Sequence, residues 1–312
     1  MKDFSSWGIK IRRFPEYEYQ AIWNNLKTLR VGFEKPKQLP ADCSEFYDIA
    51  IGTKCNLNCP FCYANSSKNG RFFTNITDKA KLFFDSMDVN QKPFQVAIGS
   101  SGEPTIHPEF SELLEILFNM GIVPNYTTNG ITIADNSISG LLEATEKYCG
   151  GVAVSVNDFN DEIHDKCRHA LDILMSLDIH VNVHVIISDS DSVIKLNRLY
   201  EDYGNKIHTY VLLPMMRHGR STTAVTPKAF EHLQLFLSMI NKSDRERFAF
   251  GANFYQYLIN QKDDERKITC SLYEPESFSK NLILDDVVKI TPSSFNTNTI
   301  LYKRKYENGI LV

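Results

Sequence analysis

Residues 55–63 read CNLNCPFCY and place three cysteines, Cys55, Cys59 and Cys62, at the spacing C-x3-C-x2-C. The run 46–51 directly before them is dominated by alternation and β-branched residues, which predicts a strand. The segment that begins at Gly52 then breaks the strand into a loop. The pattern therefore predicts three thiols that project from one loop at the C-terminal end of a strand.

Thiolates gathered in this way are soft ligands, suited to zinc, copper(I) or an iron–sulfur cluster. A structural zinc site and a four-iron cluster each normally take four protein ligands. The other cysteines precede the strand or lie far along the chain: Cys43, Cys149, Cys167 and Cys270. A cubane held by three cysteines would leave one iron open to a ligand, as at a catalytic site. A zinc-stabilised binding or regulatory protein, with a histidine or a distant cysteine as fourth ligand, is the alternative.

A second polar loop, GSSGEPT at residues 99–105, follows a second predicted strand at residues 94–98. Small residues let the backbone approach a ligand closely, and the carboxylate of Glu103 can accept hydrogen bonds from an ammonium group. This loop lies about 40 residues after the cysteine loop, across one predicted helix at residues 77–87. We therefore expect both loops at the same end of a parallel sheet.

Together the two loops resemble the signature of the radical S-adenosylmethionine (radical SAM) superfamily. In that superfamily an aromatic residue, here Tyr63, follows the third cysteine, and a G-G-E-P motif, here 101–104 with serine first, follows the next strand. The resemblance implies that Cys55, Cys59 and Cys62 bind three irons of a [4Fe-4S] cluster, whose fourth iron binds SAM. It implies reductive cleavage of SAM to a 5′-deoxyadenosyl radical, which abstracts hydrogen from a substrate.

The same resemblance implies the residues that bind SAM. Ser101, Gly102 and Glu103 match the motif that binds the methionine amine, and Tyr63 lies where the family contacts the adenine. Residues after the fourth strand match the region of the ribose contact: Ser155 and, near it, Asn157. The resemblance also implies a low-potential electron donor such as flavodoxin or ferredoxin.

Six predicted strands alternate with helices between residues 46 and 213, which argues for a parallel sheet with right-handed crossovers. Six such units match the partial (β/α)6 TIM-type barrel of the superfamily, with the site at the C-terminal strand ends. We therefore expect an α/β core at residues 45–224. An N-terminal extension (1–44), with a helix at 19–29, should precede it. A small C-terminal α+β cap (225–312) should follow, with a helix at 248–261 and a hairpin turning at Asp285-Asp286.

The substrate stays open between two classes. A faint similarity of the C-terminal region to the extensions of peptide-modifying radical SAM enzymes favours a peptide or protein, although only Cys270 is present and no auxiliary cluster is expected. The basic and aromatic N-terminal stretch 10–19, with Arg217 and Arg220, favours a nucleotide or nucleic-acid base. For both arginines, surface salt bridges are the alternative role.

Composition excludes several other classes. The net charge of −4, with acidic and basic residues interspersed, argues against an extended duplex-binding surface. No apolar run approaches the ~18 residues of a membrane helix, and the start of the chain lacks a signal-peptide pattern. Seven cysteines, three of them clustered, argue against a secreted disulfide framework. We therefore expect a cytoplasmic enzyme without membrane contact.

Overall fold

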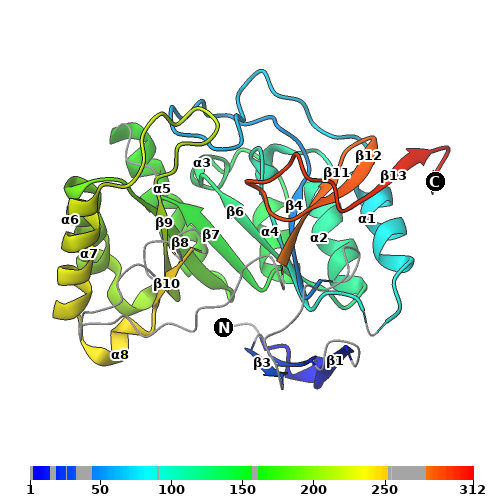
Figure 1. Cartoon of the computed structure of the whole chain (residues 1–312), viewed down its shortest axis with the longest axis horizontal. Coiled ribbons are helices and arrows are strands. Elements are labelled where there is room, and N and C mark those ends of the chain that lie inside the picture. Colours follow the sequence, from blue (N-terminus) through cyan, green and yellow to red (C-terminus); the bar gives the residue numbers. More distant parts are fainter. Residues whose placement is uncertain are drawn as a thin grey trace.

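The computed structural model describes residues 3–14, 19–25, 27–32, 44–89, 91–156, 161–251, 254 and 279–312. Its main feature is an 11-stranded sheet with the order β10-β9-β8-β7-β6-β5-β4-β11-β12-β13-β14. Neighbouring strands are parallel from β10 to β11 and antiparallel from there to β14. The protein is therefore an α/β fold built on a large, mostly parallel sheet (Figure 1).

The predicted alternation of strands and helices over residues 46–213 is confirmed. The strands are β4 (Phe46–Ala50), β5 (Gln95–Ile98), β6 (Val123–Thr128), β7 (Gly151–Ser155), β8 (His180–Ile187) and β9 (Thr209–Pro214). The helices between them are α1 (Ile76–Asp85), α2 (Phe110–Asn119), α3 (Ile131–Ala134), α4 (Leu141–Tyr148), α5 (Asp161–Met175) and α6 (Ser190–Tyr203). Because the strands are parallel, all of their C-terminal ends lie at one edge of the sheet.

The two faces of the sheet differ in polarity. On β8, Val181, Val183 and Val185 are buried among the residues of the main hydrophobic core. The alternate positions, which include Asn182 and His184, are only partly buried. Parallel sheets covered by helices on both faces usually read as continuous apolar runs. The alternation on β8 therefore marks one side of the strand for helix packing and places polar side chains such as Asn182 and His184 on the other.

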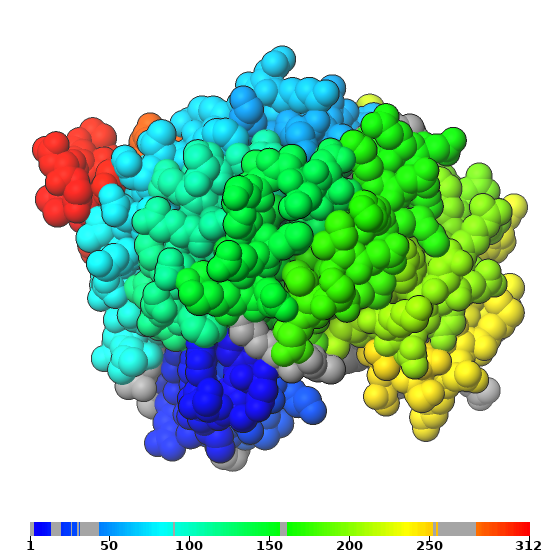
Figure 2. All heavy atoms as spheres, turned by 180° about the vertical axis from the view of Figure 1, so that it is seen from behind, coloured from blue at the N-terminus to red at the C-terminus, as the bar shows by residue number. Residues whose placement is uncertain are grey.

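The N-terminal residues form a separate antiparallel sheet of β1 (Lys10–Phe14), β2 (Tyr19–Asn24) and β3 (Lys27–Gly32). The predicted helix at 19–29 is wrong, because Asn25 turns the chain with a φ of 45° and begins a hairpin. Ala21 and Trp23, which share one side of β2, are buried with Phe94 and Val123. This sheet therefore packs where β5 and β6 begin, away from the cysteine loop (Figure 2).

The C-terminal residues extend the main sheet. They form α7 (Pro227–Met239), α8 (Lys242–Arg245), β10 (Phe248–Phe250), β11 (Ser279–Leu284), β12 (Val287–Thr291), β13 (Tyr302–Glu307) and β14 (Ile310–Leu311). The hairpin predicted at Asp285-Asp286 is confirmed. The helix predicted at 248–261 is wrong at its start, where β10 pairs with β9, and most of the remainder lies outside the described residues.

Strand β11 pairs in parallel with β4, so that Ile283 lies opposite Ala50. The strand that precedes the cysteine loop is therefore an interior strand, held by β5 on one side and β11 on the other. Within the described part of the chain, no helix is both long and apolar enough to cross a lipid bilayer.

Candidate active site

The cysteine loop leaves the C-terminal end of β4 and folds back on itself through backbone hydrogen bonds. The amide of Cys55 donates to the oxygen of Ser67 at 2.9 Å, and the amide of Cys62 donates to that of Cys59 at 3.2 Å. The three cysteines are free and partly exposed. Burial raises the pKa of the Cys55 thiol to about 12 and that of Cys59 to about 11, and the neighbouring thiols add to both shifts. Thiolates at these positions therefore need a positive centre to stabilise them.

The donor set fits an iron–sulfur cluster. Three soft thiols lie on one loop, all of them free and partly buried, and in a cubane each cysteine binds an iron of its own. Among the described residues, no three His, Cys, Asp or Glu side chains converge on a point that could hold a single metal ion. The buried hydroxyl of Ser100, at the end of β5, has no hydrogen-bond partner in the described part of the chain. A buried hydroxyl usually has a hydrogen-bond partner. A bound ligand would supply the partner that the described residues do not provide.

The loop after β5 packs directly on the cysteine loop. The Ser101 hydroxyl donates to the oxygen of Gly52 at 2.7 Å, and the amide of Gly102 donates to the hydroxyl of Ser66 at 2.8 Å. Gly102 has a φ of 75°, and a Cβ there would lie 2.8 Å from the oxygen of Lys54. Only glycine fits this position. The serine that replaces the first glycine of the motif therefore holds the two loops together.

Glu103 is buried, with 4% of its surface exposed, and its carboxylate joins two strand ends. One oxygen accepts from the hydroxyls of Thr105 at 2.6 Å and Thr128 at 2.8 Å, and the other accepts from the amide of Asn129 at 2.8 Å. Burial raises the pKa of Glu103, and these hydrogen bonds oppose the shift. The carboxylate therefore connects the loop after β5 to the turn after β6. Its binding of an ammonium group stays a prediction.

The turn after β6 also contacts the cysteine loop. The Asn129 side-chain amide donates to the side-chain oxygen of Asn56 at 2.7 Å and lies 3.8 Å from the sulfur of Cys55. Cys167 on α5 places its sulfur 3.4 Å from the oxygen of Asn129 and 3.6 Å from that of Ser155. Ser155 thus lies beside the same turn, whereas Asn157 is outside the described residues.

Tyr63 connects the cysteine loop to two other parts of the chain. Its hydroxyl donates to the oxygen of Ser100 at 2.6 Å. Its ring stacks on the ring of Phe295, with 4.5 Å between the two centroids. The ring of His218 in turn meets the ring of Phe295 edge-on, with 5.7 Å between their centroids. Phe295 follows β12 and carries no sequence signal for this contact. The C-terminal region therefore reaches the cysteine loop.

Arg220, in the loop after β9, contacts three backbone oxygens of the cysteine loop. Its Nε donates to the oxygen of Cys59 at 2.9 Å, its Nη2 to that of Ser66 at 2.7 Å, and its amide to that of Cys62 at 3.0 Å. The sequence predicts a substrate contact or a surface salt bridge for Arg220. The structure instead shows Arg220 bound to the backbone of the cysteine loop. Arg217 in the same loop is exposed.

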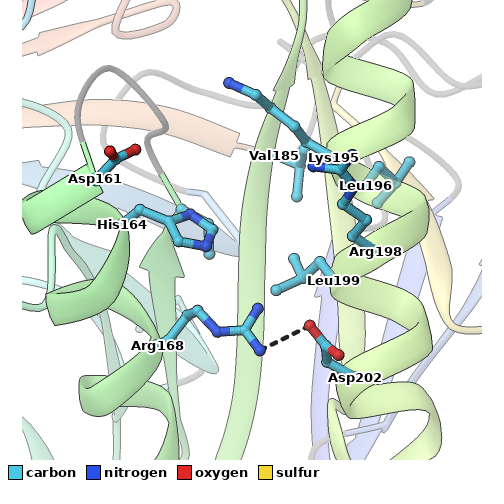
Figure 3. A pocket seen from close by; sticks show the side chains of 10 residues that line it. Asp161, His164, Arg168, Val185, Lys195, Leu196, Arg198, Leu199 and Asp202 are labelled. Carbon is cyan, nitrogen blue, oxygen red and sulfur yellow. Dashed lines mark hydrogen bonds and ion pairs between the residues drawn. The ribbon is translucent and has the colours of Figure 1, made fainter.

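A pocket of about 380 Å³ lies elsewhere, between α5 and α6 (Figure 3). Val156, Val185, Leu196 and Leu199 contribute apolar surface to it. Charged side chains surround this surface, and the Arg168–Asp202 ion pair at 2.7 Å crosses one end. Among the described residues predicted to bind the cluster or SAM, none lines this pocket.

Comparison with known proteins identifies the family. The family model described as Radical SAM superfamily matches residues 49–214, which contain both loops and strands β5 to β9. The chain belongs to the radical SAM superfamily. Members of this superfamily use SAM and a [4Fe-4S] cluster, and the reaction and substrate of this chain are separate questions.

Individual relatives cover different shares of the chain. Mycofactocin maturase MftC of Mycolicibacterium smegmatis is 27% identical over 203 residues, 61% of this chain and 50% of the relative. The subtilosin biosynthesis protein AlbA of Bacillus subtilis is 23% identical over 258 residues, 75% of this chain and 56% of the relative. The chain thus spans about half the length of these curated relatives.

A solved structure shares the fold. Streptococcus suis SuiB, determined with precursor peptide SuiA bound, superposes with a TM-score of 0.61 over 85% of this chain and 62% of SuiB. At 16% identity this likeness concerns the fold alone. It agrees with the large parallel sheet found here.

Proposed function

We propose that this radical SAM enzyme cleaves SAM reductively at a [4Fe-4S] cluster bound by Cys55, Cys59 and Cys62. The resulting 5′-deoxyadenosyl radical would abstract hydrogen from the substrate. The observation that carries the proposal is the contact of the cysteine loop with the loops after β5, β6 and β9. When bound, the cluster supplies the electron for cleavage, and a flavodoxin or ferredoxin would reduce it.

The proposed SAM site uses the residues around this contact. Glu103, Ser101 and Gly102 would bind the methionine end, Tyr63 would lie against the adenine, and the ribose would contact Ser155 and Asn157. The Ser100 hydroxyl, unpartnered among the described residues, is an additional donor. In this proposal β4 to β9 form the partial (β/α)6 barrel of a core at 45–224. Residues 1–44 form an extension, and 225–312 cover the site, with Phe295 against Tyr63.

We favour a peptide as the substrate. MftC and AlbA are named for mycofactocin maturation and subtilosin biosynthesis, and SuiB was determined with a precursor peptide bound. Two of the features that favoured a nucleotide have other contacts in the structure, whereas Arg217 is exposed. Arg220 contacts the cysteine loop, and the described N-terminal strands pack where β5 and β6 begin.

The test is anaerobic reconstitution with iron and sulfide, reduction in the presence of SAM, and quantification of 5′-deoxyadenosine. We expect cluster-dependent product from the parent and from Cys149→Ala, which changes a buried cysteine outside the loop, and none from Cys59→Ala. Candidate precursor peptides are then screened for faster product formation and for a change in peptide mass. Zinc in place of iron, with no 5′-deoxyadenosine, would instead support the zinc-stabilised alternative.

A further inference from the structure

We propose that Arg220 is a positioning residue of the cluster site, which fixes the shape of the cysteine loop and holds a positive charge beside the cluster. The inference rests on the proposed ligation of the cluster by Cys55, Cys59 and Cys62. It assigns to Arg220 two measurable effects, on the mobility of the loop and on the reduction of the cluster. Neither effect requires knowledge of the substrate.

The contacts of Arg220 match the fork geometry of a guanidinium. Two of its nitrogens donate to backbone oxygens seven residues apart, at Cys59 and Ser66, while its own amide donates to Cys62. A planar guanidinium can hold two acceptors at a fixed separation, and a lysine ammonium cannot reproduce that arrangement. Because hydrogen bonds from a charged donor are stronger than neutral ones, one side chain restrains most of the segment that carries the second and third cysteines.

The neighbouring residue makes this approach possible. Gly219 has a φ of 61°, and a Cβ there would collide with the backbone oxygens of Tyr63 and Cys62. The loop after β9 therefore lies directly on the cysteine loop, with no side chain between the two backbones. Its base is closed by the amide of Val225, which donates to the oxygen of Met215 at 2.8 Å, and the amide of Met215, directly after β9, donates to the oxygen of Ile187 on β8 at 2.8 Å. Arg220 is thus attached to the sheet independently of the cysteine loop.

The charge of Arg220 has no carboxylate partner in the described part of the chain, and its Nε lies 2.9 Å from the backbone oxygen of Cys59. A cluster bound by thiolates gains one negative charge when it is reduced. Net charge and hydrogen bonding near a cluster are among the features that set its potential. A fixed cation beside Cys59 therefore favours the reduced form, the form that a low-potential donor must produce.

The experiment compares Arg220→Gln, Arg220→Lys and a matched control, Arg217→Gln, which removes an exposed arginine from the same loop. Hydrogen–deuterium exchange is measured on the cluster-free full chain over residues 59–67, where the amides of Cys62 and Asn65 donate within the loop. The midpoint potential of the reconstituted cluster is measured by an EPR-monitored redox titration. The lysine variant keeps the charge but not the fork, so it separates the two effects.

We expect exchange over residues 59–67 to become about tenfold faster in both Arg220 variants, because charged hydrogen bonds are lost. The reduction equilibrium should shift about tenfold toward the oxidised form in Arg220→Gln only, which is 59 mV for one electron. Arg217→Gln should change neither quantity. Exchange in Arg220→Gln equal to that in the control would overturn the positioning role. An unchanged potential in cluster-loaded Arg220→Gln would overturn the electrostatic role. The exchange measurement needs no cluster, so its outcome is independent of whether the ligation proposal holds.

Discussion

Replacing Asp48 with asparagine should stabilise the protein at neutral pH. Asp48 lies on β4, on the opposite face from Tyr47 and Ile49, which are fully buried in the main core. Among the described residues its carboxylate has no hydrogen-bond or ion-pair partner, and burial raises its pKa from 3.8 to about 6. A charge held in such surroundings destabilises the folded state. Asparagine has nearly the same shape and carries no charge.

The size of the effect follows from the shift in pKa. A shift from 3.8 to about 6 corresponds to roughly 3 kcal/mol of folding free energy at pH 8, as an upper value. Between these two pKa values the folded state binds more protons than the unfolded state, so the stability of the parent falls as pH rises. The loss of folding free energy caused by the Asp48 charge is therefore complete above the pKa that Asp48 has in the folded state. This loss falls to less than about 1 kcal/mol near pH 4.

The assay is urea unfolding of the cluster-free full chain at a series of pH values from 4 to 8, for the parent, Asp48→Asn and Asp165→Asn. Asp165 is exposed on α5, so its substitution should change stability by less than about 0.5 kcal/mol at every pH. The difference between parent and Asp48→Asn should grow with pH. A difference that is constant across the range, or that favours the parent at pH 8, would refute the assignment of an unpaired, partly buried charge to Asp48.

Three further substitutions test the site. In Glu103→Gln one carboxylate oxygen becomes an NH2 group, which cannot accept the hydrogen bond that the Thr128 hydroxyl or the Asn129 amide donates to that oxygen. We expect the free energy of unfolding to fall by roughly 2 kcal/mol and SAM binding, measured by calorimetry, to weaken. Unchanged values for both quantities would contradict the role of Glu103. Gly102→Ala forces a Cβ to 2.8 Å from the oxygen of Lys54 at a φ of 75°. This substitution should lower the free energy of unfolding by about 1–3 kcal/mol and should lower the iron content after reconstitution. Full iron content together with parental stability would show that the loop adapts to the added Cβ. Phe295→Ala removes a partly buried ring that stacks on Tyr63, so the free energy of unfolding should fall by about 1 kcal/mol and the exchange rate of residues 61–65 should rise. A change confined to the C-terminal strands would count against its contact with the cysteine loop.

Local patterns predicted most of the core because they report on burial within one element. The alternation in β8 separates a valine face from a polar face, and that period is enough to predict a strand in a sheet with unlike faces. The hairpin at 19–32 shows the limit of the same reasoning. The local pattern of residues 19–29 predicts a helix, but burial of Ala21 and Trp23 against residues over 70 positions away favours a strand.

Local sequence patterns do not predict contacts between segments that are far apart in the chain. Strand β11 lies beside β4 although more than 200 residues separate them, and no local pattern distinguishes this pairing from an isolated hairpin. The sequence indicates a substrate contact or a surface salt bridge for Arg220, but its partners are backbone oxygens, which every residue possesses. The identity of the acceptors therefore could not be inferred from the types of the neighbouring side chains.

The two glycines of the site explain how separate loops can form one rigid surface. Gly102 and Gly219 both have positive φ, and each lies where a Cβ would strike the backbone of the cysteine loop. The loops after β5 and β9 consequently pack on that loop from two directions at backbone contact, and the side chains of Ser101 and Arg220 hydrogen-bond to its carbonyls. Because the surrounding strands position both loops, the sheet sets much of the geometry of the cysteines. A site held in this way is preorganised, which predicts that cluster incorporation depends more on these backbone contacts than on the exposed side chains of the cysteine loop itself.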